Sequence, residues 1–276
     1  MDARTRTREF LQGRAADRPP FLPHALDVAA RVASATRADL LADPHLLTTA
    51  LLDVVELGAF EAAVLALREE EVRGVGDGSP PAQVPALEVC AEAVSRLRAL
   101  LGERAAIAIA LPGPASLLGG RASEQDPGRL EEAAARLLQA ADFLGPPQLD
   151  VLGVVETLPV GSGDVDALEP VLSPLWNIAR FYSMPSLFLA GSAHPAVGSI
   201  GASAVAAWEG ATPDELAGAG ANRVGVPVEA SRPSRLPDLA PHQFFLTAGE
   251  IPPEAEIELV QQLTKETERA HIEVSG

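Results

Sequence analysis

Cysteine and lysine are almost missing from this chain of 276 residues, which has one of each. Cys90 stands alone, so no disulfide can form within the chain, and a metal cluster held by several thiolates is excluded. We expect Cys90 to be a small buried residue of an amphipathic helix. Lys265 is the only lysine, so almost all basic residues are arginines. We interpret this as a compositional bias of the lineage and not as a sign of a binding site.

Positive charge is scarce as well: 21 Lys and Arg residues face 38 Asp and Glu residues, and the net charge is −17. Phosphate binding needs clustered positive charge, so nucleic acid and anionic lipid are disfavoured as partners. No apolar run approaches the ~20 residues that cross a bilayer, and residues 1–12 lack the apolar core of a secretory signal. We expect a cytoplasmic protein that acts on a small-molecule substrate.

Two common catalytic motifs are also absent. The segment Gly218-Ala-Gly220 has no lysine after it and precedes an apolar run, so it is not a phosphate-binding loop. No Gly-x-Ser-x-Gly segment marks a serine nucleophile. The sequence therefore predicts no nucleotide cofactor.

What the chain does contain is a series of eight short apolar runs, at 20–23, 62–67, 105–111, 152–155, 185–190, 204–208, 224–228 and 244–249. Gly, Pro or charged residues flank them, which is typical of buried parallel strands. Segments of helical periodicity lie between, at 39–58, 86–103, 128–144 and 165–181. This alternation predicts an α/β fold, a single (β/α)8 TIM-type barrel over residues 1–276.

The second half of this barrel is expected to be trimmed, because the runs after position 185 begin only 19 to 20 residues apart. Within 165–181, Pro170 and Pro174 are predicted to confine the helix to its later part. Three segments rich in Gly, Pro and charge are interpreted as surface loops, the first two overhanging the pocket: 74–85, 119–128 and 231–241.

Four glutamates directly follow apolar runs: Glu156, Glu209, Glu229 and Glu250. The carboxyl ends of barrel strands converge on one face, so we expect these side chains to share a pocket. Crowding raises the pKa of at least one carboxyl toward neutrality, which suits a general acid or base. The same ring could bind a metal or a cation, or some members could point outward as helix caps or partners of loop arginines.

Two histidines also follow apolar runs, His24 after the first and His194 after the fifth. Together with a glutamate they could form a two-histidine, one-carboxylate metal set, although their spacing is not diagnostic and we assign no metal ligands. The alternatives are that His194 begins a short helix, and that His24 lines the pocket as a proton carrier near its ordinary pKa.

Several further residues are candidates for substrate binding. Arg68 and Arg232 could anchor a carboxylate. Pro114, in a Pro-Gly-Pro segment, could bring backbone close to a ligand or simply form a turn. Asp27 lies one helical turn from Arg31, which normally gives a weak surface pair, but it becomes an active-site acid if that segment folds over the pocket.

Six segments carry a family resemblance: 8–20, Ala-Asp-Pro-His-Leu-Leu at 42–47, Leu-Gly at 57–58, 71–76, Leu-Pro-Gly-Pro-Ala-Ser-Leu at 111–117, and Thr-Ala-Gly-Glu-Ile-Pro-Pro-Glu at 247–254. They resemble the uroporphyrinogen decarboxylase superfamily, which also contains corrinoid methyltransferases. The resemblance touches most of the chain and implies an α/β barrel.

The catalytic residues of that superfamily are not matched. The decarboxylase aspartate falls on Leu67, and its arginine-rich segment is replaced by 21–27. The zinc-binding His-x-Cys-Gly of the methyltransferases corresponds to Phe-Leu-Ala-Gly at 188–191, and their last cysteine falls near Gly249 or Glu250. The resemblance thus supports the fold more than either chemistry.

We therefore predict lyase- or decarboxylase-type acid–base chemistry on a small organic molecule other than uroporphyrinogen. One alternative is corrinoid-linked methyl transfer without the zinc ligands, with a corrinoid-protein partner. The other is a non-catalytic ligand-binding barrel or a subunit of a larger complex. A homodimer is also compatible with the sequence.

Overall fold

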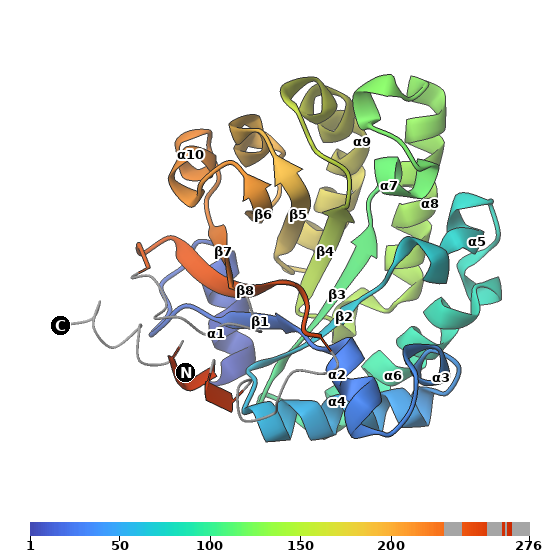
Figure 1. The fold of residues 1–276 in the computed structure, drawn as a ribbon, viewed down its shortest axis with the longest axis vertical. Helices are drawn as coiled ribbons and strands as arrows, with labels where there is room; N and C mark the ends of the chain where they lie inside the picture. The colour runs from blue at the N-terminus through green and yellow to red at the C-terminus, as the bar shows by residue number, and fades with distance from the viewer. Residues whose placement is uncertain (229–238, 253–260, 263, 267–276) are drawn as a thin grey trace.

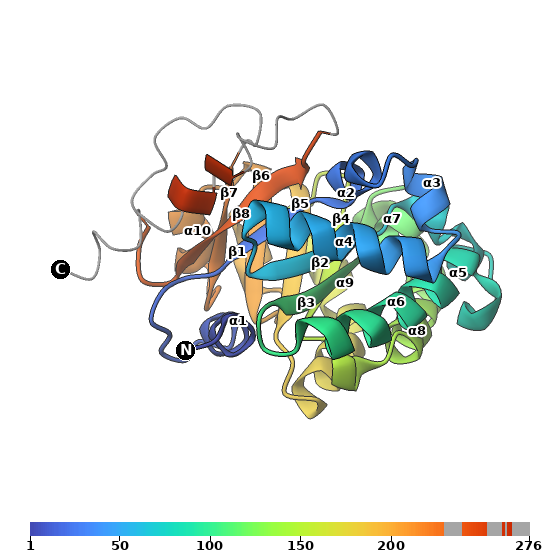
Figure 2. The same ribbon diagram turned by 90° about the horizontal axis from the view of Figure 1, so that it is seen from below.

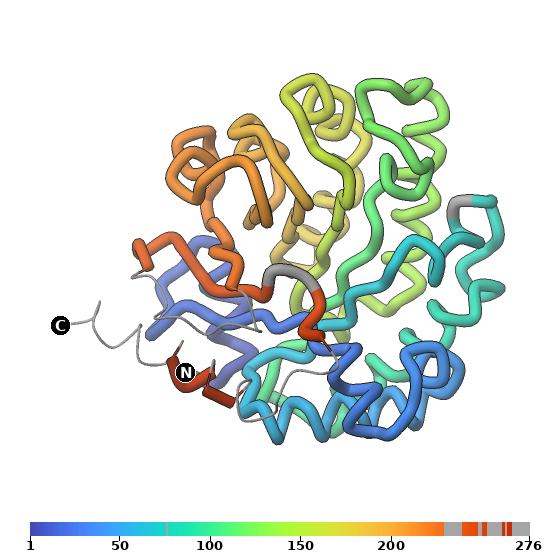
Figure 3. The backbone as a smooth tube through the Cα atoms, in the orientation of Figure 1, coloured from blue at the N-terminus to red at the C-terminus, as the bar shows by residue number. Residues whose placement is uncertain are grey.

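A computed structural model describes residues 1–228, 239–252, 261–262 and 264–266. Its eight strands pair in parallel and in chain order into one closed barrel (Figure 1), which confirms the predicted (β/α)8 fold. The strands are β1 (Phe21–His24), β2 (Ala62–Ala66), β3 (Ala106–Pro112), β4 (Val151–Glu156), β5 (Ser186–Ala193), β6 (Ala204–Gly210), β7 (Val224–Val228) and β8 (Gln243–Glu250). Pairing of β1 with β8 closes the barrel, and Figure 3 shows these two strands side by side.

Helices surround the strands, and Figure 2 shows α4 and α6 side by side on the outside of the barrel. The α-helices are α1 (Ala3–Leu11), α2 (Leu26–Val32), α3 (Arg37–Leu40), α4 (Pro44–Gly58), α5 (Arg73–Gly76), α6 (Pro85–Leu101), α7 (Pro114–Leu118), α8 (Pro127–Phe143), α9 (Ser162–Phe181) and α10 (Pro213–Gly218). The 3-10 helices are η1 (Glu69–Glu71), η2 (Pro81–Gln83), η3 (Ala122–Glu124), η4 (Pro146–Gln148) and η5 (Pro195–Ser199). Among the described helices, none is both long and apolar enough to span a bilayer.

The outer helices become short after β5, as the run spacing predicted. The connection after β5 holds only the five-residue η5, and the one after β6 holds the six-residue α10. By contrast α9, between β4 and β5, has 20 residues. The predicted loops in the first half are not wholly irregular: 74–85 includes η2, and 119–128 includes η3, while most of 231–241 lies outside the described residues.

The prediction for the helix around Pro170 and Pro174 is wrong, because α9 runs through both prolines. Both side chains are exposed, so the carbonyl groups that lose a backbone partner can bond to water. The opposite face buries Leu168, Leu172 and Trp176. Burial of such side chains stabilises by about 1.5–3 kcal/mol each, and the three together offset the two internal prolines, which cost ~3 kcal/mol each.

The core has two layers because strand side chains alternate in direction. On β3, Ala108 and Ala110 point into the barrel, where space is narrow, whereas Ile107 and Ile109 point outward against the helices. Both layers are apolar over most of each strand, which is the usual pattern of a closed parallel barrel.

At the amino-terminal end of the strands, α1 covers the floor of the barrel (Figure 2). Asp150, which is 0% exposed, accepts hydrogen bonds from Arg4 Nε at 2.7 Å, from Arg98 and from the backbone N–H of Ile107 at 2.8 Å. Arg8 lies within ion-pair distance. We call Asp150 and its three arginines the floor cluster, and it ties α1 and α6 to β4.

Candidate functional site

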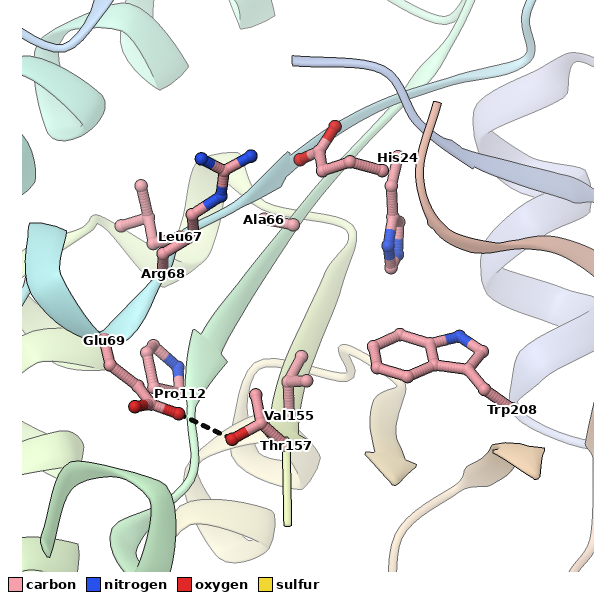
Figure 4. A pocket seen from close by; sticks show the side chains of 10 residues that line it. His24, Ala66, Leu67, Arg68, Glu69, Pro112, Val155, Thr157 and Trp208 are labelled. Atoms are coloured by element: carbon pink, nitrogen blue, oxygen red, sulfur yellow. Dashed lines mark hydrogen bonds between the residues drawn. The ribbon is translucent and has the colours of Figure 1, made fainter. Parts of the chain in front are cut away.

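The carboxyl ends of the strands surround a cavity of about 180 Å³, which we call the mouth pocket (Figure 4). Apolar side chains form much of its wall, and polar groups enter from several strands. The lining residues are His24, Ala66, Leu67, Arg68, Glu69, Pro112, Val155, Thr157, Trp208 and Glu250. Segments that are remote in sequence therefore meet here, as expected for this fold.

Strand alternation decides which of the predicted residues reach the pocket. On β1, Leu22 belongs to the inner core, so His24, two residues later, also points inward. On β8, Leu246 is an inner residue, and Glu250 has the same orientation. Trp208 on β6 follows the same rule and faces His24 across the pocket (Figure 4).

Glu156 and Glu209 have the opposite orientation, so the prediction that they line a common pocket is wrong. Val155 and Trp208 point into the barrel, and the residue after each must therefore point away from it. Glu209 is exposed to solvent. Glu156 is buried outside the strands, beneath α7, and does not line the mouth pocket.

His24 is the most deeply buried polar group of the pocket, with 3% of the residue exposed. Its backbone N–H donates to Thr247 Oγ1 at 2.9 Å, but its imidazole makes no hydrogen bond to any described residue. Burial, helped by the nearby charge of Arg37, lowers the pKa of His24 to about 4. The expectation of an ordinary histidine pKa is thus corrected: at neutral pH the ring is uncharged, with one nitrogen able to donate and one able to accept.

Arg37, which the sequence analysis missed, fills the space beside the pocket. Its side chain is 9% exposed, and all five of its N–H groups are used. The guanidinium donates to both carboxylate oxygens of Glu71, to Asp27 Oδ1 at 3.1 Å, to Glu250 Oε1 at 3.0 Å and to the carbonyl of Ala66. Burial alone would lower the pKa of Arg37, but these acids outweigh it and raise the pKa, so the charge is retained.

We call Arg37, its three carboxylates and Arg68 the mouth cluster. Glu250 accepts from the backbone N–H of Leu26 at 3.0 Å as well as from Arg37. Burial raises the pKa of Glu250, and Arg37 opposes that rise. Asp27 is held by Arg37 and by Arg68, whose Nη2 lies 2.6 Å from Asp27 Oδ2. Arg68 is 44% exposed and lines the pocket, but its charge is engaged by Asp27.

Glu156 holds the loop after β3 instead of a ligand. Its Oε1 accepts from the backbone N–H of Ala115 at 3.1 Å, and its Oε2 accepts from the N–H and Oγ–H of Ser116 at 2.8 and 2.7 Å. Burial raises the pKa of Glu156 to about 7 in spite of these hydrogen bonds. Pro114 is the buried first residue of α7 and does not line the mouth pocket, which favours the structural-turn alternative.

Gly113 allows this arrangement, and Gly113→Ala is expected to destabilise the protein by about 1–3 kcal/mol. A Cβ atom at Gly113 would lie 2.1 Å from Glu156 Oε1, although the backbone conformation, with φ of −71°, suits any residue. Urea unfolding measures the loss. Gly218→Ala, where a Cβ meets open space, is the matched control. If the cost persists undiminished in a Glu156→Ala background, the clash with Glu156 is not its cause.

The remaining candidates lie elsewhere. His194 is exposed and begins η5, where its Nδ1 accepts from the backbone N–H of Ala196 at 3.2 Å, which bears out the helix-start alternative. Glu229 and Arg232 lie outside the described residues.

No three His, Cys, Asp or Glu side chains in the described part of the chain are grouped so as to hold a metal ion. The positions that correspond to the zinc-binding histidine and to the cysteine two residues after it present no ligand atoms either: Phe188 and Ala190 are both buried on β5. Cys90 is buried as expected, and burial raises the pKa of its thiol to about 12, so it stays protonated. The described residues do not fit the zinc site that the resemblance implies.

The fold and the pocket together define a (β/α)8 barrel with its cavity at the carboxyl ends of the strands, where barrel enzymes hold their active sites. No family model and no curated protein matches the chain. Among solved structures, a methyltransferase from Methanosarcina mazei is similar, with a TM-score of 0.77 and 16% sequence identity over 98% of this chain and 99% of that one. At this identity the likeness extends to the fold and not to the chemistry.

Proposed function

We propose that this chain is a group-transfer enzyme that binds a small neutral or cationic molecule in the mouth pocket, with methyl as the transferred group. The observation that carries the proposal is the meeting, in one cavity, of Glu250 and Trp208 with His24, whose uncharged imidazole makes no hydrogen bond to a described residue. A buried imidazole without a protein partner costs free energy unless a ligand or water completes its hydrogen bonds.

The charge of the pocket favours a neutral or cationic substrate over an anion. Glu69 and Glu250 both line it, Arg37 has no N–H group left to donate, and Arg68 is paired with Asp27. The face of Trp208 can also attract a cation. Among the described residues, these contacts favour a methyl acceptor such as an amine, an alcohol or a thiol over a substrate that binds through a carboxylate. A solved methyltransferase has the same fold, so the fold is compatible with this choice.

In this reaction His24 orients the acceptor atom by a hydrogen bond and remains neutral throughout, because its lowered pKa makes it a weak base. The acceptor gives up its proton to a carboxylate of the pocket as its bond to the methyl carbon forms. The bond between that carbon and the donor breaks, and its electron pair stays with the donor. The donor suggested by the family resemblance is a methylated corrinoid carried by a partner protein.

His24→Asn is expected to lower kcat/KM by about 100-fold, since asparagine offers hydrogen bonds but cannot reach the imidazole position; this corresponds to about 2.7 kcal/mol. The assay mixes the protein with methylcobalamin and a panel of amines, alcohols and thiols, and follows the visible spectrum of the corrinoid. His194→Asn, at the exposed histidine that begins η5, is the control and should retain activity. Failure of every acceptor to demethylate the corrinoid would reject methyl transfer.

Ligand binding can be followed separately through Trp208 fluorescence. The other tryptophan, Trp176, is buried and donates to the carbonyl of Ile200 at 3.1 Å, so it serves as an internal reference. A fluorescence change that is lost in Trp208→Phe reports ligand binding in the mouth pocket. Binding of this kind without turnover of any acceptor would favour the non-catalytic ligand-binding barrel.

A further inference from the structure

Four side-chain oxygens form a continuous path from buried Glu156 to the mouth pocket. Ser116 Oγ lies 2.7 Å from Glu156 Oε2 and 3.2 Å from Thr157 Oγ1, and Thr157 Oγ1 lies 2.6 Å from Glu69 Oε1. Figure 4 shows the last of these contacts at the pocket wall. Glu156 itself is 1% exposed, so this path is its link to the pocket.

The number of hydrogens on this path depends on the charge of the two carboxyl groups. Each hydroxyl has one hydrogen to donate. If Glu156 and Glu69 are both ionised, Ser116 donates to Glu156 and Thr157 donates to Glu69, and no hydrogen remains for the 3.2 Å contact between the two hydroxyls. If one proton sits on either carboxyl, the hydroxyls point the same way and all three contacts are hydrogen bonds.

We propose that Glu156 and Glu69 share one proton through Ser116 and Thr157, and that this relay exchanges protons between the buried carboxyl and the mouth pocket. A proton that reaches Glu69 passes to the Thr157 hydroxyl, whose own proton moves to Ser116, whose proton moves to Glu156. Both hydroxyls end neutral and reoriented, and nothing is oxidised or reduced. The sharing stands without the proposed function, whereas its use in turnover rests on that function.

The surroundings of Glu156 suit this role. The backbone N–H groups of Ala115 and Ser116 donate to the Glu156 carboxylate, and Glu156 Oε2 also accepts from the Ser116 hydroxyl. Across a small cavity, the charged groups that face it are Arg121 and Asp164, which pair with each other at 2.7 Å and so cancel. Burial raises the pKa of Glu156, with a smaller contribution from the charge of Glu69, to about 7, so both protonation states are populated near neutral pH.

The test follows the carbonyl band of a protonated carboxylic acid by infrared spectroscopy of the protein without substrate, as a function of pH. We expect a band that titrates near neutrality and is lost in Glu156→Gln. Thr157→Val keeps the shape of the side chain but breaks the relay, and it should lower the titration midpoint by about one pH unit, the equivalent of one hydrogen bond. Thr157→Ser keeps the hydroxyl and should titrate like the wild type.

An absent band, or a midpoint that is the same in Thr157→Val and the wild type, overturns the relay. If the methyl-transfer assay succeeds, Thr157→Val should also lower kcat about 10-fold and remove the limb near neutrality from its pH profile, while Thr157→Ser restores both. If that assay fails but the band shifts as stated, the proposed function is rejected and the shared proton is retained.

Discussion

Arg37→Met is expected to lower the free energy of unfolding by about 3–5 kcal/mol, because it leaves the partly buried carboxylates of Glu71 and Glu250 without a counter-charge. Arg37 is the only cation that bonds both Glu71 and Glu250 among the described residues, and its side chain is 9% exposed. Methionine fills much of the same volume, so the loss reports the charge and the hydrogen bonds more than the packing. The mouth pocket should also lose the fixed position of Glu250.

Urea unfolding at neutral pH measures this loss. The control is Arg96→Met, which removes an exposed pair between Arg96 and Glu92 on α6 and should cost less than about 0.5 kcal/mol. Arg37→Lys keeps the charge with fewer donors and should fall between the two. An Arg37→Met variant as stable as Arg96→Met would mean that the mouth cluster contributes little to stability.

The second large effect is expected at the opposite end of the barrel, where Asp150→Asn should also cost about 3–5 kcal/mol. The amide keeps the shape of the carboxylate but turns an NH₂ group toward N–H donors, and it leaves Arg4 and Arg98 without their shared anion. Since Arg4 belongs to α1, the packing of this helix against the barrel floor should weaken first.

Thermal and urea unfolding, together with amide hydrogen exchange of α1, measure the effect of Asp150→Asn. Asp142→Asn is the matched control, because Asp142 is exposed on α8 and such surface changes stay within about 0.5 kcal/mol. Equal stability of the two variants, or unchanged exchange in α1, would contradict a structural role for the floor cluster.

The fold could be predicted from the sequence because the signals were local. Each apolar run is short and is bounded by residues that break regular structure, and each of the eight predicted runs contains or overlaps an observed strand. The helix through Pro170 could not be predicted in the same way. There the burial of one face against the barrel outweighs a local signal that ends helices.

The site was predicted less well because the sequence does not show which side chains of each strand point into the barrel. Residues that follow a run were expected to share the pocket, but Glu156 lies one position out of phase with Val155 and Glu250 lies in phase with Leu246. In an amphipathic strand, alternation of polar and apolar residues would reveal the phase. A barrel strand is apolar on both faces, so its sequence shows no alternation from which the inward-facing residues could be identified.

Arg37 and Glu69 were missed for a different reason. Both stand in short polar segments, at the starts of α3 and η1, which have the composition of surface loops. Their partners, Glu250 for Arg37 and Thr157 for Glu69, are 213 and 88 positions away in the chain. Only the closed barrel brings these pairs together, and no local pattern indicates them.

During folding, the mouth pocket can form only after β1 has paired with β8. His24 receives its backbone hydrogen-bond acceptor, Thr247, and its neighbour Glu250 from β8, the last strand of the barrel in chain order. Such a distant contact forms late, since the loop-closure entropy of most of the chain must be overcome first. In refolding experiments, recovery of ligand binding should therefore lag behind the recovery of helical circular dichroism and coincide with the final, slowest phase.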